Sequence, residues 1–343
     1  MKMLICIFLA CLMLFCSFWK SERKELDARL QGLAGSAILS TRKIDIPGYP
    51  KAFNPSLIPY QEGYLLSFRT RHRIQKGTLH ARKKDVSFLG VVKLDRDFRV
   101  VEKSAQLLDV SSYAMHSSST AEDGRLFKLG SRIFIFFNDF PLSNNKGYAP
   151  YFAELIEKEK RFLVKESAKQ LNYAHAIPVE KNWSPFSSND KLYLIYSDEP
   201  RVILEVDSDT GECSEVARYP TEWQWQWGEI RGGTPALQLD DALLTFFHSS
   251  IPSNLKKSRG GRLYVMGAYI FDAHFPFTPR KVTAVPLGEK EYYTKENRHN
   301  VVFPGGLAIE EHLIHVAWGK NNKQIHITTF NKAKLLHSLG LVK

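Results

Sequence analysis

The sequence predicts an all-β fold, a five-bladed β-propeller, from three observations. A pattern of two apolar stretches split by a turn occurs five times, its internal spacing is constant, and no helical period lies between the copies. The copies start 51 to 70 residues apart, which is long enough for a four-stranded sheet with loops. All-β repeats of this size are typical of propeller blades, and a closed ring of blades can contain 343 residues in one domain.

Each copy opens with small, polar or charged residues and ends its second apolar run 14 residues later. Two strands of about five to six residues and a tight turn fill that length, so each copy is a β-hairpin. Turn signals such as Asn189-Asp190 precede the second run. The openings begin at Asn54, Asp123, Asn182, Gly233 and Phe303, and the runs end at Phe68, Phe137, Tyr196, Phe247 and Ala317.

Three parts follow from this pattern: a signal or membrane-anchor segment (1–19), a linker (20–45) and the propeller (46–335). The segment from Leu4 to Trp19 is uncharged and mostly apolar, and its sixteen residues are long for a signal core and short for a full span. We therefore expect a membrane-anchored or exported protein and leave the side of the membrane open. Three of the four cysteines lie in this segment, so Cys213 has no disulfide partner in the propeller.

The formal charge is +11, and the chain contains two basic clusters, 69–73 and 256–259. A solvated surface, an anionic ligand and membrane headgroups all remain open as explanations. We expect no nucleic-acid partner, because no known binding module is present. We also expect no cofactor and no metal, since the histidines at 312, 315 and 326 lack compact ligand spacing.

A hairpin begins and ends at one end of its sheet, so the five openings and the residues just past the strand ends should meet at one mouth of the central channel. This ring is polar and ionisable, and ligands commonly bind at such mouths. The residues past the strand ends are Arg69, Asn138, Ser197, His248 and Trp318. The openings contribute Asn54, Glu122, Asp123, Arg125, Lys181, Asn182, Arg231 and Thr234.

Several of these residues also have a structural interpretation. Asp123 before Gly124 suits a turn, and Arg69 and Lys181 could form ion pairs with the acidic residues. His248 could be a buried rim histidine. The alternating Trp223, Trp225 and Trp227 face one side of an extended segment, as packing between blades or as a wall that stacks on a sugar.

An ordered series of short motifs resembles glycoside hydrolase family 130, the β-mannoside phosphorylases and their relatives. The series runs from residue 54 to about 325 and covers all five blades. It comprises Asn54-Pro55, Arg69, Glu122-Asp123-Gly124-Arg125, Glu180-Lys181-Asn182-Trp183-Ser184-Pro185-Phe186, Arg231-Gly232-Gly233-Thr234-Pro235, His248, Met266-Gly267-Ala268, Phe303-Pro304-Gly305-Gly306 and Trp318-Gly319.

The resemblance implies a five-bladed propeller that cleaves β-mannosides by inverting attack of phosphate. It implies Asp123 as the general acid, Arg69, Arg125 and Lys181 as contacts to phosphate or sugar, and inorganic phosphate as a co-substrate. One carboxylic acid suffices for phosphorolysis, whereas an inverting hydrolase needs a second carboxylate to activate water. The expected sugar contacts are Asn54, Asn138, Asn182, Arg231, Gly233, Thr234, His248 and Phe303.

The chain departs from this family at three places. Tyr196-Ser197 stands where phosphorylases typically carry a phosphate-binding histidine, Gly124 replaces a proline, and Asn321-Asn322 stands where relatives often have aspartate. Asp198, Glu199 or Glu229 could then act as a water-activating base.

We therefore expect a carbohydrate-active propeller, an inverting glycoside phosphorylase or hydrolase acting on a β-linked, mannose-containing oligosaccharide. The alternative is a non-catalytic carbohydrate-binding propeller.

Overall fold

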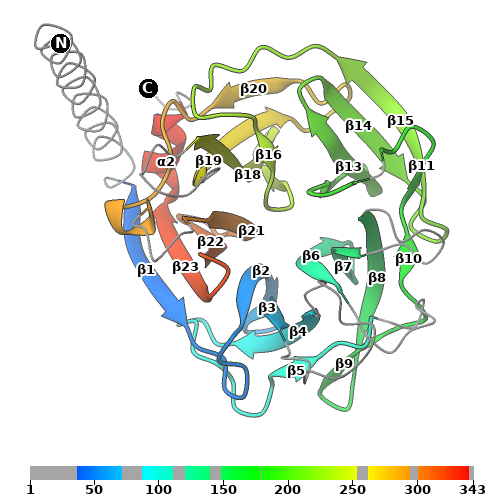
Figure 1. The fold of residues 1–343 in the computed structure, drawn as a ribbon, viewed down its shortest axis with the longest axis vertical. Coiled ribbons are helices and arrows are strands. Elements are labelled where there is room, and N and C mark those ends of the chain that lie inside the picture. Colours follow the sequence, from blue (N-terminus) through cyan, green and yellow to red (C-terminus); the bar gives the residue numbers. More distant parts are fainter. Residues whose placement is uncertain are drawn as a thin grey trace, which may run out of the picture.

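A computed structural model describes residues 37–71, 87–110, 120–139, 148–177, 179–252, 262–293 and 300–339. It contains five antiparallel-rich sheets arranged in a ring, which confirms the predicted five-bladed propeller (Figure 1). The segment 1–19, the basic cluster 256–259 and part of the cluster 69–73 lie outside the described residues, so the membrane-anchor or signal prediction stays a prediction. In the described ranges, no helix is both long and apolar enough to cross a membrane.

The first two blades begin with the predicted hairpins. Blade 1 comprises β2 (Phe53–Tyr60), β3 (Gly63–Arg71), β4 (Ser87–Leu94) and β5 (Gln106–Leu107). Blade 2 comprises β6 (Glu122–Leu129), β7 (Arg132–Asp139), β8 (Ala149–Lys158) and β10 (Lys169–Gln170), and β9 (Arg161–Val164) pairs with β8.

The next two blades repeat this order with small variations. Blade 3 comprises β12 (Ser184–Ser188), β13 (Lys191–Asp198), β14 (Arg201–Val206), β15 (Glu212–Tyr219) and β11 (Asn172–Tyr173), which pairs in parallel with β15. In blade 4 the inner strand is split into β16 (Arg231–Gly232) and β17 (Leu237–Leu239), followed by β18 (Ala242–Pro252), β19 (Arg262–Asp272) and β20 (Pro279–Val282).

Blade 5 joins the two ends of the described chain. It comprises β21 (Val302–Ile309), β22 (Leu313–Lys320), β23 (Gln324–Asn331) and β1 (Ile38–Ile44), which pairs antiparallel with β23. A short 3₁₀ helix, η2 (Lys290–Tyr293), precedes the blade and α2 (Lys332–Ser338) follows it. The range 20–45 was expected to be a linker, but its last part is this outer strand, so the propeller begins at Ile38.

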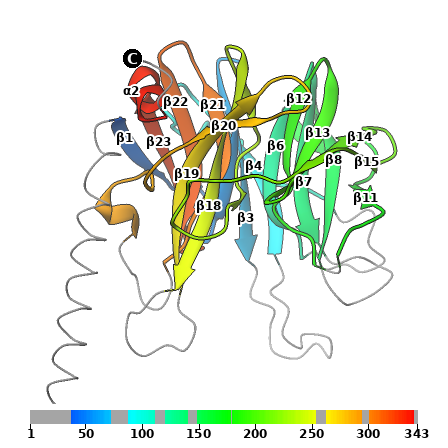
Figure 2. The same ribbon diagram turned by 90° about the horizontal axis from the view of Figure 1, so that it is seen from above.

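All five hairpins have tight turns at the far end of the blade from the mouth. In blade 3 both Asn189 and Asp190 adopt positive φ, 49° and 60°, as the favoured two-residue hairpin turn requires. The second strands run longer than expected. Arg69, Asn138, Ser197, His248 and Trp318 therefore lie inside their strands, between one and four residues before the strand ends. Figure 2 shows β3 and β18 ending at the same end of the ring.

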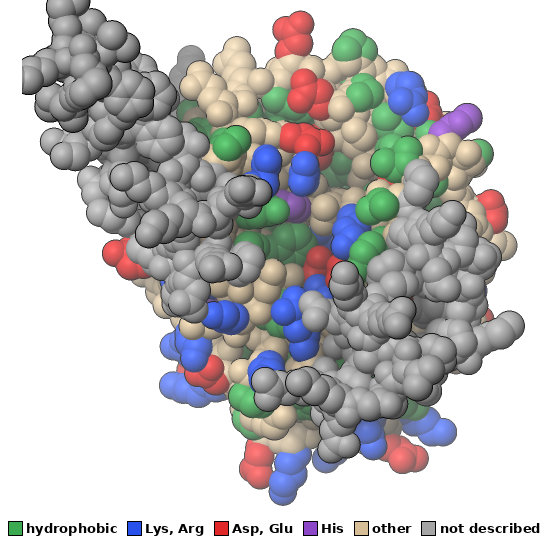
Figure 3. All heavy atoms as spheres, in the orientation of Figure 1, with side chains coloured by type: hydrophobic (Ala, Val, Ile, Leu, Met, Phe, Trp, Pro, Cys, Tyr) green, Lys and Arg blue, Asp and Glu red, His purple; other side chains and the backbone are tan. Residues whose placement is uncertain are grey.

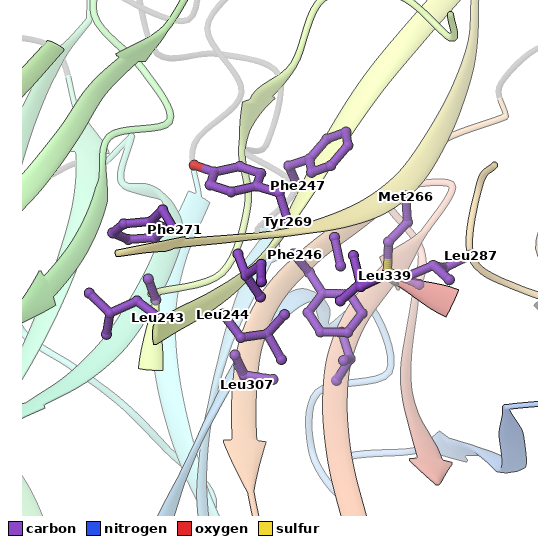
Figure 4. Packing of buried hydrophobic residues seen from close by; sticks show 14 of the residues in the cluster. Leu243, Leu244, Phe246, Phe247, Met266, Tyr269, Phe271, Leu287, Leu307 and Leu339 are labelled. Atoms are coloured by element: carbon purple, nitrogen blue, oxygen red, sulfur yellow. The ribbon is translucent and has the colours of Figure 1, made fainter. Parts of the chain in front are cut away.

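The hydrophobic core lies between neighbouring blades. Separate buried clusters fill the contacts of blade 1 with blade 2, of blade 2 with blade 3, and of blade 5 with blade 1. The largest cluster joins blades 3, 4 and 5 (Figure 4). Its labelled members are Leu243, Leu244, Phe246, Phe247, Met266, Tyr269, Phe271, Leu287, Leu307 and Leu339. This packing fixes the relative positions of the inner strands and so of the mouth.

Candidate active site

Three blades begin with an asparagine or aspartate in the left-handed backbone conformation. Asn54, Asp123 and Asn182 have φ values of 46°, 56° and 66°. Asn and Asp tolerate this region better than most side chains, which explains their choice at these openings. A bulge in the pairing of β2 with β3 and of β6 with β7 accompanies the first two. Bulges re-aim side chains, and here the polar groups turn toward the neighbouring blade.

The five predicted opening positions are linked to one another at the mouth. The Asn54 Nδ2 donates to Asp123 Oδ1 at 2.8 Å. Arg125 then reaches from blade 2 to the other three openings: its Nη2 donates to Asn182 Oδ1 at 3.3 Å, its Nε donates to the Gly233 carbonyl at 2.5 Å, and its guanidinium lies 5.4 Å from the Phe303 ring centroid. The five openings of the 14-residue pattern in the sequence therefore lie together at one mouth of the propeller.

Asp123 has one oxygen fixed by the protein and one without a partner. Oδ1 accepts from Asn54 and lies 3.6 Å from Arg69 Nη1, whereas Oδ2 accepts no hydrogen bond from any described residue, and 13% of the side chain is exposed. Burial alone would raise the pKa of Asp123, but Arg69, Asn54, Arg125 and Lys181 together lower it below the ordinary value. The unliganded side chain is therefore an ionised carboxylate with one oxygen available to a ligand.

Glu122 uses both of its oxygens. Oε1 accepts from Arg69 Nη2 at 2.7 Å and from the Tyr148 hydroxyl at 3.1 Å, and Oε2 accepts from Lys181 Nζ at 2.8 Å. The Lys181 ammonium also lies 3.4 Å from the centroid of the Tyr148 ring. Arg69 and Lys181 thus form the ion pairs that the sequence left open, with Glu122 as their shared partner. Tyr148 was not predicted, because it lies outside the repeated 14-residue unit.

Arg125 binds blades together. It is buried, and all its described hydrogen bonds go to other blades, namely to Asn182, to the Gly233 carbonyl and, at 3.4 Å, to the Gly232 carbonyl. Burial lowers its pKa to about 10, although nearby Asp123 opposes the shift. Its geometry suits a structural role more directly than the predicted contact to phosphate.

Replacing Arg125 with alanine should lower the free energy of unfolding by about 3–5 kcal/mol, because Asn182 and the Gly232 and Gly233 carbonyls lose their donor and Asp123 loses a nearby positive charge. Chemical denaturation measures this loss. The control is Arg132→Ala, which removes a partly exposed arginine that pairs with Glu154 at the start of β7. That change should cost less than about 1 kcal/mol. Equal losses for the two variants would contradict the assigned role.

His248 and Phe303 line the mouth beside Arg125. The two rings lie 5.1 Å apart, and Tyr264 stacks on His248 at 6.2 Å. Burial, helped by Arg125 and Arg231, lowers the pKa of His248 to about 3, so the ring is neutral at physiological pH. A neutral imidazole can accept or donate a hydrogen bond to a hydroxyl group but cannot bind phosphate as a cation.

The other predicted residues are distributed unequally. Asn138 is buried in the cross-strand pair with Glu122, close to the mouth. Arg231 pairs with Glu229 at 2.6 Å on the more exposed rim. Thr234 is fully buried, and its hydroxyl accepts from the Phe246 backbone amide, so it stabilises blade 4 and contributes no group to the mouth.

The tryptophan row packs between blades, which decides between its two interpretations. Trp225 and Trp227 are buried, Trp225 Nε1 donates to Ser249 Oγ, and Trp223 Nε1 donates to the Asp198 carbonyl. Asp198 is also buried, where it pairs with Arg201 at 2.7 Å and accepts from the Tyr269 hydroxyl. Burial raises the pKa of Asp198. This aspartate is a packed structural group between blades 3 and 4.

Four buried polar atoms around the mouth have no hydrogen-bond partner among the described residues. Buried groups of this kind normally have a hydrogen-bond partner, so a cluster of exceptions indicates bound water or ligand. Figure 3 views the ring of blades face on and shows a central hollow with apolar side chains at its base and charged side chains around it. Among the described residues, the unpartnered atoms at the mouth are Asn54 Oδ1, Arg69 Nε, Asn138 Nδ2 and His248 Nδ1.

Comparison with solved structures finds mannoside phosphorylases and glycoside hydrolases. A β-1,2-mannobiose phosphorylase from Listeria innocua superposes with a TM-score of 0.59 at 17% identity, covering 88% of this chain and 94% of that one. A mannose phosphorylase from Leishmania mexicana, in complex with phosphate ion, gives 0.61 at 13% identity, covering 92% and 95%. The fold is that of the family 130 mannoside phosphorylases.

A third structure with this fold comes from work describing family 130 glycoside hydrolases that target β-1,2-mannosidic linkages in Candida mannan. Its TM-score is 0.61 at 12% identity, covering 83% of this chain and 85% of that one. The structures that share the family 130 fold therefore include both phosphorylases and hydrolases. Neither the protein-family models nor the curated proteins match this sequence.

Proposed function

We propose that this propeller cleaves a β-linked, mannose-containing glycan with inversion, using Asp123 as the general acid and inorganic phosphate as the nucleophile. The observation that carries the proposal is the division of the Asp123 carboxylate into one fixed oxygen and one free oxygen at the mouth. A general acid needs a defined orientation and an unobstructed atom that can hold the transferred proton. Glu122 offers no such atom, because both of its oxygens accept hydrogen bonds.

The choice of phosphate over water is supported by the state of the other carboxylates. Inverting hydrolysis needs a second carboxylate placed to activate water, whereas phosphate supplies its own nucleophilic oxygen. Asp198 is buried in an ion pair, and Glu229 is paired with Arg231 at the rim with 65% of its side chain exposed. Glu199 is exposed in the turn between β13 and β14. The Asp198 carboxylate is committed to Arg201 and the Tyr269 hydroxyl, and Glu199 and Glu229 are exposed, so none of the three suits the role of a base.

Lys181 is the cation best able to reach a bound anion. Its side chain is 31% exposed, whereas that of Arg69 is 6% exposed. An ammonium carries three N–H donors, and Glu122 takes one of them, so donors remain for a phosphate oxygen. The neutral His248, Phe303 and the asparagines at 54, 138 and 182 would contact the sugar.

Replacing Lys181 with methionine should raise the KM for phosphate by roughly tenfold with kcat changed much less, because a charge-assisted contact to the co-substrate is lost. Initial rates at saturating glycan and varied phosphate measure the effect. Lys191→Met is the control, because Lys191 forms an ion pair of the same 2.8 Å length with Glu205 at a hairpin turn. An unchanged KM in the Lys181 variant would remove this residue from the phosphate site.

The pH dependence should differ between the two kinetic parameters. The free protein governs kcat/KM, and its Asp123 has a pKa below the ordinary value, so kcat/KM should fall about tenfold per pH unit between about pH 5 and 7. In the complex, a bound anion neutralises the cations and raises the pKa of Asp123, so the alkaline limb of kcat should lie at higher pH. A flat kcat/KM over this range would contradict Asp123 as the acid.

A non-catalytic carbohydrate-binding propeller is the second candidate. The lowered pKa of Asp123 favours it, because an ionised carboxylate accepts hydrogen bonds from sugar hydroxyls without any proton transfer. Calorimetry with β-mannooligosaccharides, followed by analysis of the same samples for products, separates the two candidates. Binding without sugar 1-phosphate or free sugar would support the binder.

A further inference from the structure

Glu122 lies between two cations of the mouth and has no evident catalytic task. Its Oε1 accepts from Arg69 at 2.7 Å and its Oε2 accepts from Lys181 at 2.8 Å. Only 13% of the side chain is exposed. Because both oxygens are occupied, this carboxylate cannot bind a ligand directly, and its effect on ligands must come through its charge.

The charges around Asp123 nearly cancel. The described groups that face one another there are the cations Arg69, Arg125 and Lys181 and the carboxylates Glu122 and Asp123. Three positive and two negative charges leave one net positive charge, and without Glu122 the same cluster would carry two. A dianion such as phosphate or sulfate would therefore meet a much stronger site in the absence of Glu122.

We propose that Glu122 sets the charge of the ligand that the mouth accepts. Its carboxylate occupies the position of an oxyanion between Arg69 and Lys181. The mouth therefore binds a neutral glycan and one weakly held inorganic oxyanion, and it disfavours glycans that carry acidic groups. This inference rests on the proposed function, because it takes Arg69 and Lys181 as the anion subsite.

The two cations have contacts in addition to those with Glu122. The Arg69 guanidinium lies 5.2 Å from the Phe53 ring centroid and 3.6 Å from Asp123, and the Lys181 ammonium stacks on Tyr148. Cation–π contacts keep such groups oriented when an ionic partner is removed. When the Glu122 charge is removed, we therefore expect Arg69 and Lys181 to keep their positions and to form a preorganised oxyanion site.

Calorimetric titration with sulfate at constant ionic strength tests the proposal. The Glu122→Gln protein should bind sulfate at least roughly tenfold more tightly than the unmodified protein, because an opposing charge next to the anion is gone. The gain should disappear in the Glu122→Gln, Lys181→Met double variant. Glu205→Gln removes the partner of Lys191 in the matched ion pair at a hairpin turn and should leave sulfate binding unchanged.

A purely structural role for Glu122 predicts a different result, namely a lower melting temperature with sulfate affinity equal to or weaker than that of the unmodified protein. That outcome overturns the proposal. If Glu122→Gln does not fold, Glu122→Asp decides, because the shorter carboxylate cannot bridge both cations and should tighten sulfate binding by about threefold. No gain in that variant also overturns the proposal. Sulfate binding is measured without glycan, so a failure of the phosphorolysis proposal would be seen separately.

Discussion

Replacing Asp123 with asparagine should lower glycan turnover by about 10²- to 10⁴-fold, the usual contribution of a general acid, while glycan affinity stays within about tenfold. The amide has the shape of the carboxylic acid but cannot deliver a proton from Oδ2. The backbone should tolerate the change, because Asn54 and Asn182 occupy the equivalent left-handed positions in blades 1 and 3. Steady-state kinetics measure turnover, and calorimetry measures binding.

The control for this variant is Asp240→Asn. Asp240 has a φ of 54°, nearly identical to the 56° of Asp123, but lies in the hairpin turn of blade 4 at the other end of the blade. Its replacement should leave turnover unchanged. Full activity of the Asp123 variant would contradict the assignment, and Glu229 and Glu199 would be the next carboxylates to replace.

Removal of β1 should destabilise the propeller by about 3–6 kcal/mol, since the buried Ile44 and the partly buried Ile38 lose their packing along with the strand pairing to β23. This strand lies beside blade 1 in the sequence but belongs to blade 5, so it holds the first and last blades together. A chain that begins at residue 45 should show a lower and broader unfolding transition. Differential scanning calorimetry measures both features.

The matched truncation begins at residue 37 and retains β1, including the hydrogen bond from the Asn331 amide to the Ala37 carbonyl. We expect this shorter chain to fold cooperatively. Equal melting temperatures for the two truncated proteins would show that side-chain packing alone closes the ring.

The five hairpins could be predicted because each carries its own signal, an opening, a turn and two apolar runs at fixed spacing. The strand β1 could not, because its partner β23 lies almost 300 residues away and the residues of β1 precede the first repeat. Its sequence has four charged or hydroxyl-bearing residues in a row, Ser40 to Lys43, which is typical of an outer strand and equally of a linker. The pairing of this segment with β23, which closes the ring, distinguishes an outer strand from a linker.

The convergence of the candidate site residues at one mouth was predictable from the sequence, whereas their contacts were less so. Asn54, Asp123 and Asn182 occupy the same position in their repeats, and each has a left-handed backbone conformation. Because every hairpin starts at the same end of its blade, these three residues meet at one mouth. The long side chain of Arg125 crosses to three other blades, and neither its reach nor its direction is encoded by spacing. The contact of Tyr148 with Lys181 depends on a part of blade 2 that has no counterpart in the repeat.

The most direct test of the account is the product formed from a β-linked mannooligosaccharide in the presence of inorganic phosphate, followed by ³¹P and ¹H nuclear magnetic resonance. Inverting phosphorolysis predicts an α-configured sugar 1-phosphate that appears only when phosphate is present and is not formed by the Asp123→Asn protein. Free sugar released at the same rate with and without phosphate, or a sugar 1-phosphate of β configuration, would contradict it.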